Sequence, residues 1–354
     1  MLNLDCADVR IMDRTFKIFG HADDRWFQSL KANGQHTEFD HSKLRHIIKD
    51  GDICLDLGAN LGTMTLAIAM ATPAGHVYAY EASQETTEAL KQTIRANGLI
   101  NATAFAAAVG RPDQLMKFFD VPRMRAGGHC VPDDDDHNRS IHEPETARMY
   151  EVRTKSVDQI VAELGLSRVD FIKIDVEGAE LDVLDGARDT LMRFKPTVMM
   201  EFNSFAFLMI REIVPRHALK KIMAIFDKVY YFENRNGDLM QLAKTEDNLE
   251  RFLQHNLTEG FVDDLLCAFD ERNIRIDRMR PSAESSAIPL DPASPPQTEH
   301  ASNKKALTAL SPAEAAAEIE RLRGELAAVR ASTSWRITKP LRWLKGHTGN
   351  LAAG

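Results

Sequence analysis

The sequence predicts an α/β fold built on a mostly parallel, doubly wound sheet of seven strands. Short, nearly continuous apolar runs alternate with helical patterns between about residues 52 and 243. A glycine-rich turn follows the first apolar run, and acidic residues end two later runs. These observations indicate one repeating strand, turn and helix pattern that gathers polar groups at a single edge of the sheet.

Seven segments have the composition of strands, and the last two are expected to form a closing antiparallel hairpin across Arg235, Asn236 and Gly237. The segments are DICLDL (52–57), HVYAYE (76–81), TAFAAAV (103–109), VDFIKID (169–175), PTVMMEF (196–202), KVYYFEN (228–234) and DLMQLA (238–243). The first five are short and nearly continuously apolar, which is typical of strands covered by helices on both faces. Residues 1–50 are expected to form a lead-in of helices and a strand.

Three helices are predicted between these strands from their apolar periodicity. They are LGTMTLAIAMA (61–71), QETTEALKQTIRANG (84–98) and AELDVLDGARDTLMRF (179–194). The second helix is expected to stop at Gly98, directly after Asn97, because glycine readily ends a helix.

Composition excludes several classes of protein. With 44% apolar and 27% charged residues, the 354-residue chain has the composition of a soluble globular protein. A net charge of -8 gives no general reason to expect nucleic-acid binding. The four cysteines form no CxxC pair, so neither a zinc site nor a disulfide framework is expected. Because no secretory signal or membrane-spanning run is evident, a cytoplasmic location is expected.

The composition changes along the chain and predicts five parts. A lead-in (1–50) precedes a Rossmann-like domain (51–275), and a flexible linker rich in Pro and Ser follows (276–312). A short coiled-coil helix (313–331) and a basic aromatic tail (332–354) complete the organisation.

The two C-terminal parts suggest a surface contact. Apolar residues at alternating three and four spacing mark the coiled coil, and basic residues interleave with tryptophan and leucine in the tail; these residues are Ile319, Leu322, Leu326, Val329, Trp335, Arg336, Lys339, Arg342, Trp343 and Lys345. Such a pattern suits an anionic membrane surface or a protein partner. Residues 313–345 are therefore expected to make a peripheral contact at the inner face of the membrane or with a partner.

The turn after the first strand carries the strongest functional signal. Asp56, Gly58, Asn60 and Gly62 occupy it, and Glu81 ends the second strand 23 residues after Gly58. Glycine permits positive φ angles and a close approach of the backbone to a ligand. An acid at this spacing can accept hydrogen bonds from ribose hydroxyls. The turn is therefore a candidate nucleotide site, and tight packing of a strand against a helix is the alternative.

The residue at position 60 separates two nucleotide cofactors. A dinucleotide site would have glycine there, so that a pyrophosphate could lie against the helix N-terminus, and Asn60 disfavours this. S-adenosylmethionine instead presents an amino-acid zwitterion, which needs N–H donors for its carboxylate and acceptors for its ammonium. Asp56 and the Asn60 carbonyl suit that task, whereas Glu81 fits the ribose of either cofactor. The sequence thus favours S-adenosylmethionine.

A second acidic turn follows the fourth predicted strand. Asp175 and Glu177 are expected at the same sheet edge as the glycine-rich turn. A carboxylate there can accept the proton of a substrate hydroxyl, orient the substrate, or cap the next helix, and these roles stay open. Lys173, inside the strand, is expected to be buried and paired.

A long polar segment, RMRAGGHCVPDDDDHNRSIHEPE (123–145), separates the third and fourth predicted strands. It is too long for a minimal connection and is expected to line or cover an acceptor pocket. His129 and His142 are candidates for a general base because histidine titrates near neutrality. The segment has no recognised metal-ligand spacing, so a solvated acidic loop is expected and no metal is assigned.

From about residue 40 to 270, the sequence resembles the FkbM family of S-adenosylmethionine-dependent methyltransferases, which act mostly as O-methyltransferases on sugars and natural products. The segments that carry the resemblance are DLGANLG (56–62), YEAS (80–83), AAVG (107–110), FIKIDVEGAELDVLDGA (171–187) and PTVMMEF (196–202). The resemblance implies the class I methyltransferase fold and S-adenosylmethionine as cofactor.

The resemblance also assigns roles to residues. It implies that the cofactor's amino-acid part lies at Asp56, Gly58, Asn60 and Gly62 and its ribose at Glu81, and that Asp175 and Glu177 belong to the active-site motif. The family more often has proline after the acid equivalent to Glu81, where this chain has Ala82. The carboxylate itself is retained.

The C-terminal STSWRITKPLRWL (332–344) is similar to a tail on bacterial glycosyltransferases and related enzymes of cell-surface polysaccharide assembly. We therefore expect an S-adenosylmethionine-dependent O-methyltransferase that methylates a sugar hydroxyl in polysaccharide or glycan biosynthesis. A non-catalytic scaffold recruited to a polysaccharide-assembly complex and an NAD-dependent oxidoreductase are the alternatives. The sequence leaves the oligomeric state open.

Overall fold

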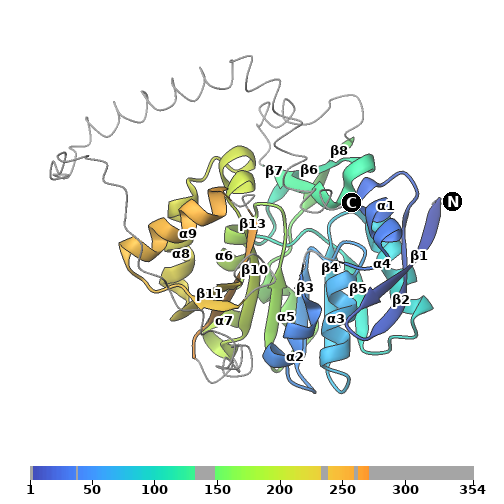
Figure 1. Ribbon diagram of the computed structural model, residues 1–354, viewed down its shortest axis with the longest axis horizontal. Coiled ribbons are helices and arrows are strands. Elements are labelled where there is room, and N and C mark those ends of the chain that lie inside the picture. Colours follow the sequence, from blue (N-terminus) through green and yellow to red (C-terminus); the bar gives the residue numbers. More distant parts are fainter. Residues whose placement is uncertain (1–2, 37–38, 132–147, 233–237, 259–261, 271–354) are drawn as a thin grey trace, which may run out of the picture. The chain divides into compact units, whose positions relative to one another are not determined.

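A computed structural model describes most of the first 270 residues of the chain (Figure 1). The described ranges are 3–36, 39–131, 148–232, 238–258 and 262–270, all within the unit Met1–Pro281. His142 and the predicted linker, coiled coil and tail lie outside these ranges, so the expectations about them stay predictions. None of the described helices combines the length and apolar character that a membrane crossing requires.

A central sheet of eight strands has the order β12-β11-β13-β10-β9-β3-β4-β5. The strands are β3 (Ile53–Leu57), β4 (His76–Glu81), β5 (Ala102–Ala106), β9 (Phe171–Ile174), β10 (Thr197–Asn203), β11 (Lys228–Phe232), β12 (Leu239–Gln241) and β13 (Val262–Ala268). The pairs among β5, β4, β3, β9 and β10 are all parallel. The mostly parallel, Rossmann-like sheet predicted from the sequence is confirmed, and its strand order reverses between β3 and β9.

The sheet differs from the prediction by one strand. β13 inserts between β10 and β11 and pairs antiparallel with both, whereas the predicted sheet closed with the β11–β12 hairpin alone. The hairpin itself is present, with Phe232 opposite Leu239. Asp263 and Asp264 interrupt the apolar pattern of β13, yet both are buried, which is why the sequence did not indicate a core strand there.

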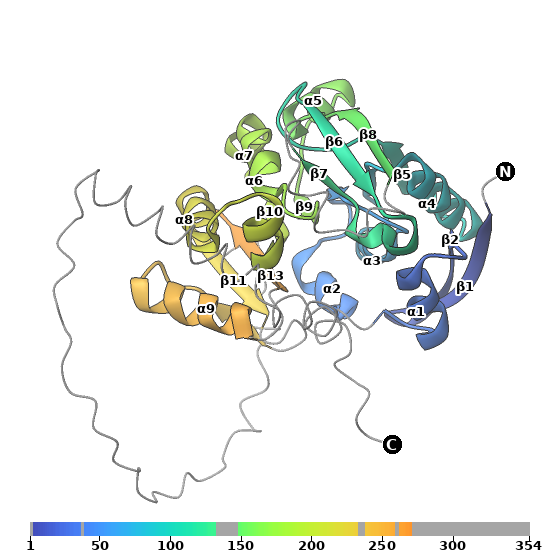
Figure 2. The same ribbon diagram turned by 90° about the horizontal axis from the view of Figure 1, so that it is seen from above.

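Helices cover both faces of the sheet (Figure 2). They are α2 (Leu44–Ile47), α3 (Thr63–Ala71), α4 (Gln84–Ala96), α5 (Val157–Glu163), α6 (Glu180–Asp185), α7 (Arg188–Phe194), α8 (Pro215–Ile225) and α9 (Glu246–Thr258). Figure 2 shows α5 to α8 on one side and α2 and α3 on the other. The buried residues accordingly form two large apolar clusters, one containing Leu66 of α3 and the other Val183 of α6.

The predicted helix over residues 179–194 is wrong as a single element. It divides into α6 and α7, with Gly186 and Ala187 between them. A Cβ at Gly186 would lie 2.2 Å from the carbonyl oxygen of Gly110. The break therefore accommodates a close approach of two backbones that a periodicity pattern does not reveal.

The lead-in contains more strand than expected. β1 (Leu4–Ile11) and β2 (Arg14–His21) form an antiparallel hairpin before α1 (Arg25–Asn33). Alternate residues of the hairpin are buried in the first apolar cluster, among them Val9 and Ile18. The alternation of apolar and charged residues here has the period of a half-buried strand.

A second small sheet was also not predicted. Its strands are β6 (Leu115–Asp120), β7 (His129–Val131) and β8 (Arg148–Arg153), in the order β7-β6-β8. Figure 1 shows this sheet above the central one. Part of the long polar segment predicted to cover a pocket is thus a strand, β7.

The core cluster around α8 provides a test of the fold. Phe226 is fully buried and its ring centroid lies 5.1 Å from that of Phe269. Phe226→Ala is expected to lower the free energy of unfolding by about 3–5 kcal/mol, because it leaves a cavity. Met192→Ala removes a side chain that is 73% exposed and should change it by less than about 0.5 kcal/mol. Urea denaturation of both variants checks this, and equal effects would contradict the assigned core.

Candidate functional site

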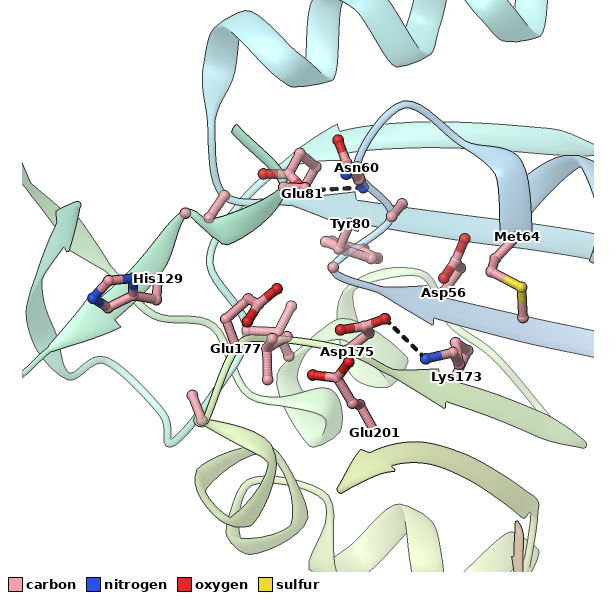
Figure 3. Close-up of a pocket in the computed structure, with 18 of the residues that line it drawn as sticks. Asp56, Asn60, Met64, Tyr80, Glu81, His129, Lys173, Asp175, Glu177 and Glu201 are labelled. Atoms are coloured by element: carbon pink, nitrogen blue, oxygen red, sulfur yellow. Dashed lines mark hydrogen bonds and ion pairs between the residues drawn. The ribbon is translucent and has the colours of Figure 1, made fainter. Parts of the chain in front are cut away.

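A pocket lies at the carboxyl ends of β3, β4, β9 and β10, next to the point where the strand order reverses (Figure 3). The residues predicted from the sequence that line it are Asp56, Gly58, Asn60, Glu81, His129, Asp175 and Glu177. The topology therefore brings together turns that are more than 100 residues apart in the chain, as expected for an open α/β sheet.

Gly58 and Gly62 have different roles in the glycine-rich turn. Gly58 has a φ of 84°, and a Cβ on it would lie 1.7 Å from the carbonyl oxygen of Asp175. This turn can therefore approach the acidic turn only with glycine at position 58. Gly62 has a φ of 95° and packs against Leu90 of α4. It is not among the residues that line the pocket, so its contact is with α4 on the side of the turn away from the pocket.

Asp56 and Asn60 offer hydrogen-bond acceptors to the pocket. Asp56 is buried at the end of β3 and accepts a 2.5 Å hydrogen bond from Thr65 Oγ1. Burial raises the pKa of Asp56 to about 6, and the Thr65 hydrogen bond and the Lys173 charge oppose this rise. Asn60 has a φ of 48°. Its buried Oδ1 has no hydrogen-bond partner within the part of the chain that the structure describes, as expected of an atom that binds a ligand donor.

Glu81 joins the end of β4 to the glycine-rich turn. Its Oε2 accepts a 3.0 Å hydrogen bond from Asn60 N, and its Oε1 accepts one of 2.9 Å from Ser83 N. Burial raises the pKa of Glu81 to about 7, although these backbone donors oppose the rise. The side chain thus stands at the pocket wall with a carboxylate that two backbone groups orient.

Lys173 is buried and paired, as predicted. Its Nζ lies 3.1 Å from Asp175 Oδ2 and 3.7 Å from Asp264 Oδ1. Burial alone would lower the pKa of Lys173, but the nearby carboxylates of Asp175, Asp264 and Glu201 raise it above its ordinary value. A buried ammonium is thus kept charged beneath the acidic side of the pocket.

The side chains of Asp175, Glu177 and Glu201 form a cluster of three carboxylates on that side, here called the carboxylate cluster (Figure 3). Each contributes one oxygen, and these oxygens lie within 4.8 Å of one another. Glu201 comes from β10 and was missed in the sequence. An acid inside the buried run PTVMMEF is the signal that could have identified it, because an unpaired charge is rarely buried in a strand.

The carboxylate cluster is suited to more than one kind of chemistry. A carboxylate can accept a proton from a substrate hydroxyl, and carboxylate oxygens are also the ligands that Mg²⁺ and Ca²⁺ prefer. The N-cap residue of α6 is Ala179, which makes no side-chain capping hydrogen bond. A role of Asp175 or Glu177 at this helix end stays a prediction.

His129 lines the pocket at some distance from the carboxylate cluster. It is buried in β7, with Nδ1 3.0 Å from the carbonyl oxygen of Gly127 and its ring stacked on Phe119. Figure 3 shows its side chain apart from Asp175, Glu177 and Glu201. The backbone contact and the stacking fix its ring, and its role as a base stays a prediction.

Aromatic residues of the lead-in form another wall of the pocket, which the sequence did not indicate. Trp26, His36 and Phe39 all line it. The rings of Trp26 and His36 meet edge to face, with centroids 6.0 Å apart. The pocket therefore has an acidic side from the central sheet and an aromatic side from the first 40 residues.

Comparison with known proteins gives a family match. Residues 56–230 match the family described as Methyltransferase FkbM domain. AMB antimetabolite synthetase AmbE of Pseudomonas aeruginosa is 26% identical over 182 residues, which are 43% of this chain and 8% of that protein. The 31-O-demethyl-FK506 methyltransferase FkbM of Streptomyces tacrolimicus is 27% identical over 172 residues, 42% of this chain and 65% of that protein. This chain thus spans less than two thirds of either relative.

Among solved structures, a SAM-dependent O-methyltransferase of Thermotoga maritima aligns with a TM-score of 0.35 and 14% identity, over 74% of this chain and 76% of that one. The family match confirms the resemblance found in the sequence. It covers both turns that meet at the pocket. Residues 56–230 of this chain are therefore similar to the FkbM methyltransferase domain.

Proposed function

We propose that this chain is an S-adenosylmethionine-dependent O-methyltransferase whose acceptor is a sugar hydroxyl. The observation that carries the proposal is that the carboxylate cluster and the glycine-rich turn line the same pocket. Acceptors for a cationic cofactor and a place for a substrate proton are thus adjacent.

The residues at the glycine-rich turn fit S-adenosylmethionine. The Asn60 Oδ1 and the Asp56 carboxylate provide acceptors for an ammonium, and Glu81 provides one for ribose hydroxyls. The turn has Asn60, not glycine, at the position where a dinucleotide site would let a pyrophosphate approach. The residues therefore favour this cofactor over NAD.

S-adenosylmethionine supplies an electrophilic methyl group on a sulfonium. The chain's residues then have to place an acceptor oxygen in line with that methyl group and take up its proton. Transfer of the methyl group from sulfur to the acceptor oxygen would give a methyl ether and S-adenosylhomocysteine, and a carboxylate of the chain would take up the hydroxyl proton. Glu177 and Glu201 are our candidates for that carboxylate, since Asp175 is held in an ion pair by Lys173.

Two further observations support a hydroxyl acceptor, in particular a sugar. The Streptomyces tacrolimicus relative is named for methylation at an oxygen. Aromatic rings of Trp26, His36 and Phe39 line the same pocket as the acids, a combination that suits a ring with apolar faces and hydroxyl edges.

The cofactor assignment predicts the effect of removing its acceptors. Asp56→Ala and Glu81→Ala are each expected to weaken binding of S-adenosylhomocysteine by about 10- to 100-fold, the value of a hydrogen bond to a charged group. Isothermal titration calorimetry measures this. Glu163→Ala, at an exposed ion pair outside the pocket, is the control and should leave the affinity unchanged. Absence of binding by the unaltered chain would instead favour a non-catalytic scaffold.

The raised pKa of Glu81 predicts a pH dependence of cofactor binding. An ionised carboxylate accepts ribose hydroxyl hydrogen bonds more strongly than a protonated one. Because the pKa is about 7, the affinity for S-adenosylhomocysteine should increase as the pH rises from about 6 to about 8. Glu81→Gln should bind more weakly and lose most of this increase over the same range. An equally steep profile in that variant would show that another group is responsible.

The acceptor assignment is tested by methyl transfer from labelled S-adenosylmethionine to a panel of methyl glycosides of hexoses and deoxyhexoses. Glu177→Gln and Glu201→Gln should retain affinity for S-adenosylhomocysteine. At least one of them should lose about 10²- to 10⁴-fold in kcat, the usual contribution of a general base. Transfer to non-sugar hydroxyls but to no sugar would refute the sugar assignment and leave the methyltransferase assignment in place.

A further inference from the structure

The acidic turn after β9 has an unusual backbone conformation. Glu177 has a φ of 53° and Gly178 one of 99°. Positive φ is uncommon for a residue with a side chain and needs support from its surroundings. The conformation places the Glu177 carboxylate beside those of Asp175 and Glu201.

Glu180, the first residue of α6, provides support from beneath the turn. It is fully buried. Its Oε1 accepts hydrogen bonds from Val176 N at 3.2 Å and Gly178 N at 3.1 Å. One carboxylate oxygen thus binds the backbone immediately before and immediately after Glu177.

Other contacts also hold the turn. Ala179 N donates a 3.4 Å hydrogen bond to the carbonyl of Val176. Asp175 N donates a 2.9 Å hydrogen bond to the carbonyl of Leu57, which anchors the turn to β3. On the far side, Gly178 packs against Ala206 and Arg211. Glu180 is thus a side chain that binds backbone N–H groups on both sides of Glu177.

The buried carboxylate of Glu180 is costly for the stability of the fold, which suggests that it has a further role. Its Oε2 is buried with no hydrogen-bond partner in the part of the chain that the structure describes. Burial raises the pKa of Glu180 to about 7. An apolar side chain of this size would avoid the penalty of a buried, half-satisfied carboxylate.

We propose that Glu180 is a positioning residue, which acts through the backbone of Val176 and Gly178 to hold the Glu177 carboxylate in the pocket. The inference rests on the proposed function, since it assigns a residue that supports the same reaction. Glu180 does not line the pocket.

Three substitutions separate this role from a general structural one. Glu180→Gln keeps an acceptor oxygen for the two N–H groups, whereas Glu180→Met has similar length and no such acceptor. Glu180→Asp keeps the charge but withdraws the carboxylate by one methylene. Asp158→Leu is the matched control, because Asp158 also accepts from two backbone N–H groups, those of Asp189 and Thr190, and lies outside the pocket.

Three measurements are made on each full-length variant. Hydrogen exchange of the Val176 and Gly178 amides should be about 10-fold faster or more in Glu180→Met and Glu180→Asp, and close to that of the unaltered chain in Glu180→Gln. Methyl transfer to the methyl glycosides should fall by about 10- to 100-fold in kcat in the first two, with the Gln variant largely restored. S-adenosylhomocysteine affinity should stay within about 3-fold in all of them. The control should alter stability but not kcat.

The outcomes distinguish this inference from the proposed function. Faster exchange with unchanged kcat in Glu180→Met and Glu180→Asp overturns the positioning role and leaves the methyltransferase assignment intact. Loss of kcat in Glu180→Gln equal to that in Glu180→Met also overturns it, because the acceptor would then be irrelevant. Failure of the unaltered chain to bind S-adenosylhomocysteine refutes the proposed function, while the exchange rates still report whether Glu180 holds the turn.

Discussion

The contact between the α-carbon of Gly58 and the carbonyl of Asp175 is the constraint on which the rest of the site depends. Any side chain at position 58 would overlap that carbonyl. The N–H of Asp175 also binds the carbonyl of Leu57, so the ends of β3 and β9 are joined by a hydrogen bond as well as by packing. The glycine-rich turn and the acidic turn are thus packed and hydrogen-bonded to each other. This contact fixes the position of the predicted cofactor residues relative to the carboxylate cluster.

Charge balance gives this unit its second constraint. Three of the acids that line the pocket, Asp175, Glu201 and Asp264, act on the buried ammonium of Lys173. The lysine tolerates burial because the acids surround it, and the acids can lie close together because the lysine offsets part of their repulsion. Each group therefore depends on the others, and a cationic ligand would complete the balance better than an anionic one.

The parts of the fold and of the site that could be predicted are those whose cause lies within one short segment of the sequence. Parts that depend on contacts between distant segments could not be predicted. The parallel strands and Glu81 could be predicted because buried strands and their terminal acids leave a contiguous pattern. Glu201 left a signal, an acid inside a buried run, that its neighbours in sequence did not explain. β13 could not be predicted, since its Asp264 is paired with Lys173, which lies far earlier in the chain. Trp26 reaches the pocket only because the lead-in packs against the sheet, and no pattern in 1–50 encodes that destination. The Glu180 hydrogen bonds likewise follow from the shape of the turn, and the sequence indicated only a helix.

The interior place of β13 bears on when this site can exist during synthesis. β10 and β11 are both paired with β13, and it is the last strand of the sheet to leave the ribosome. Until residues 262–268 emerge, two strand edges of the sheet remain open and Lys173 lacks Asp264. A nascent chain can thus form the cofactor turn early, yet the acidic side of its pocket is completed only by the final strand.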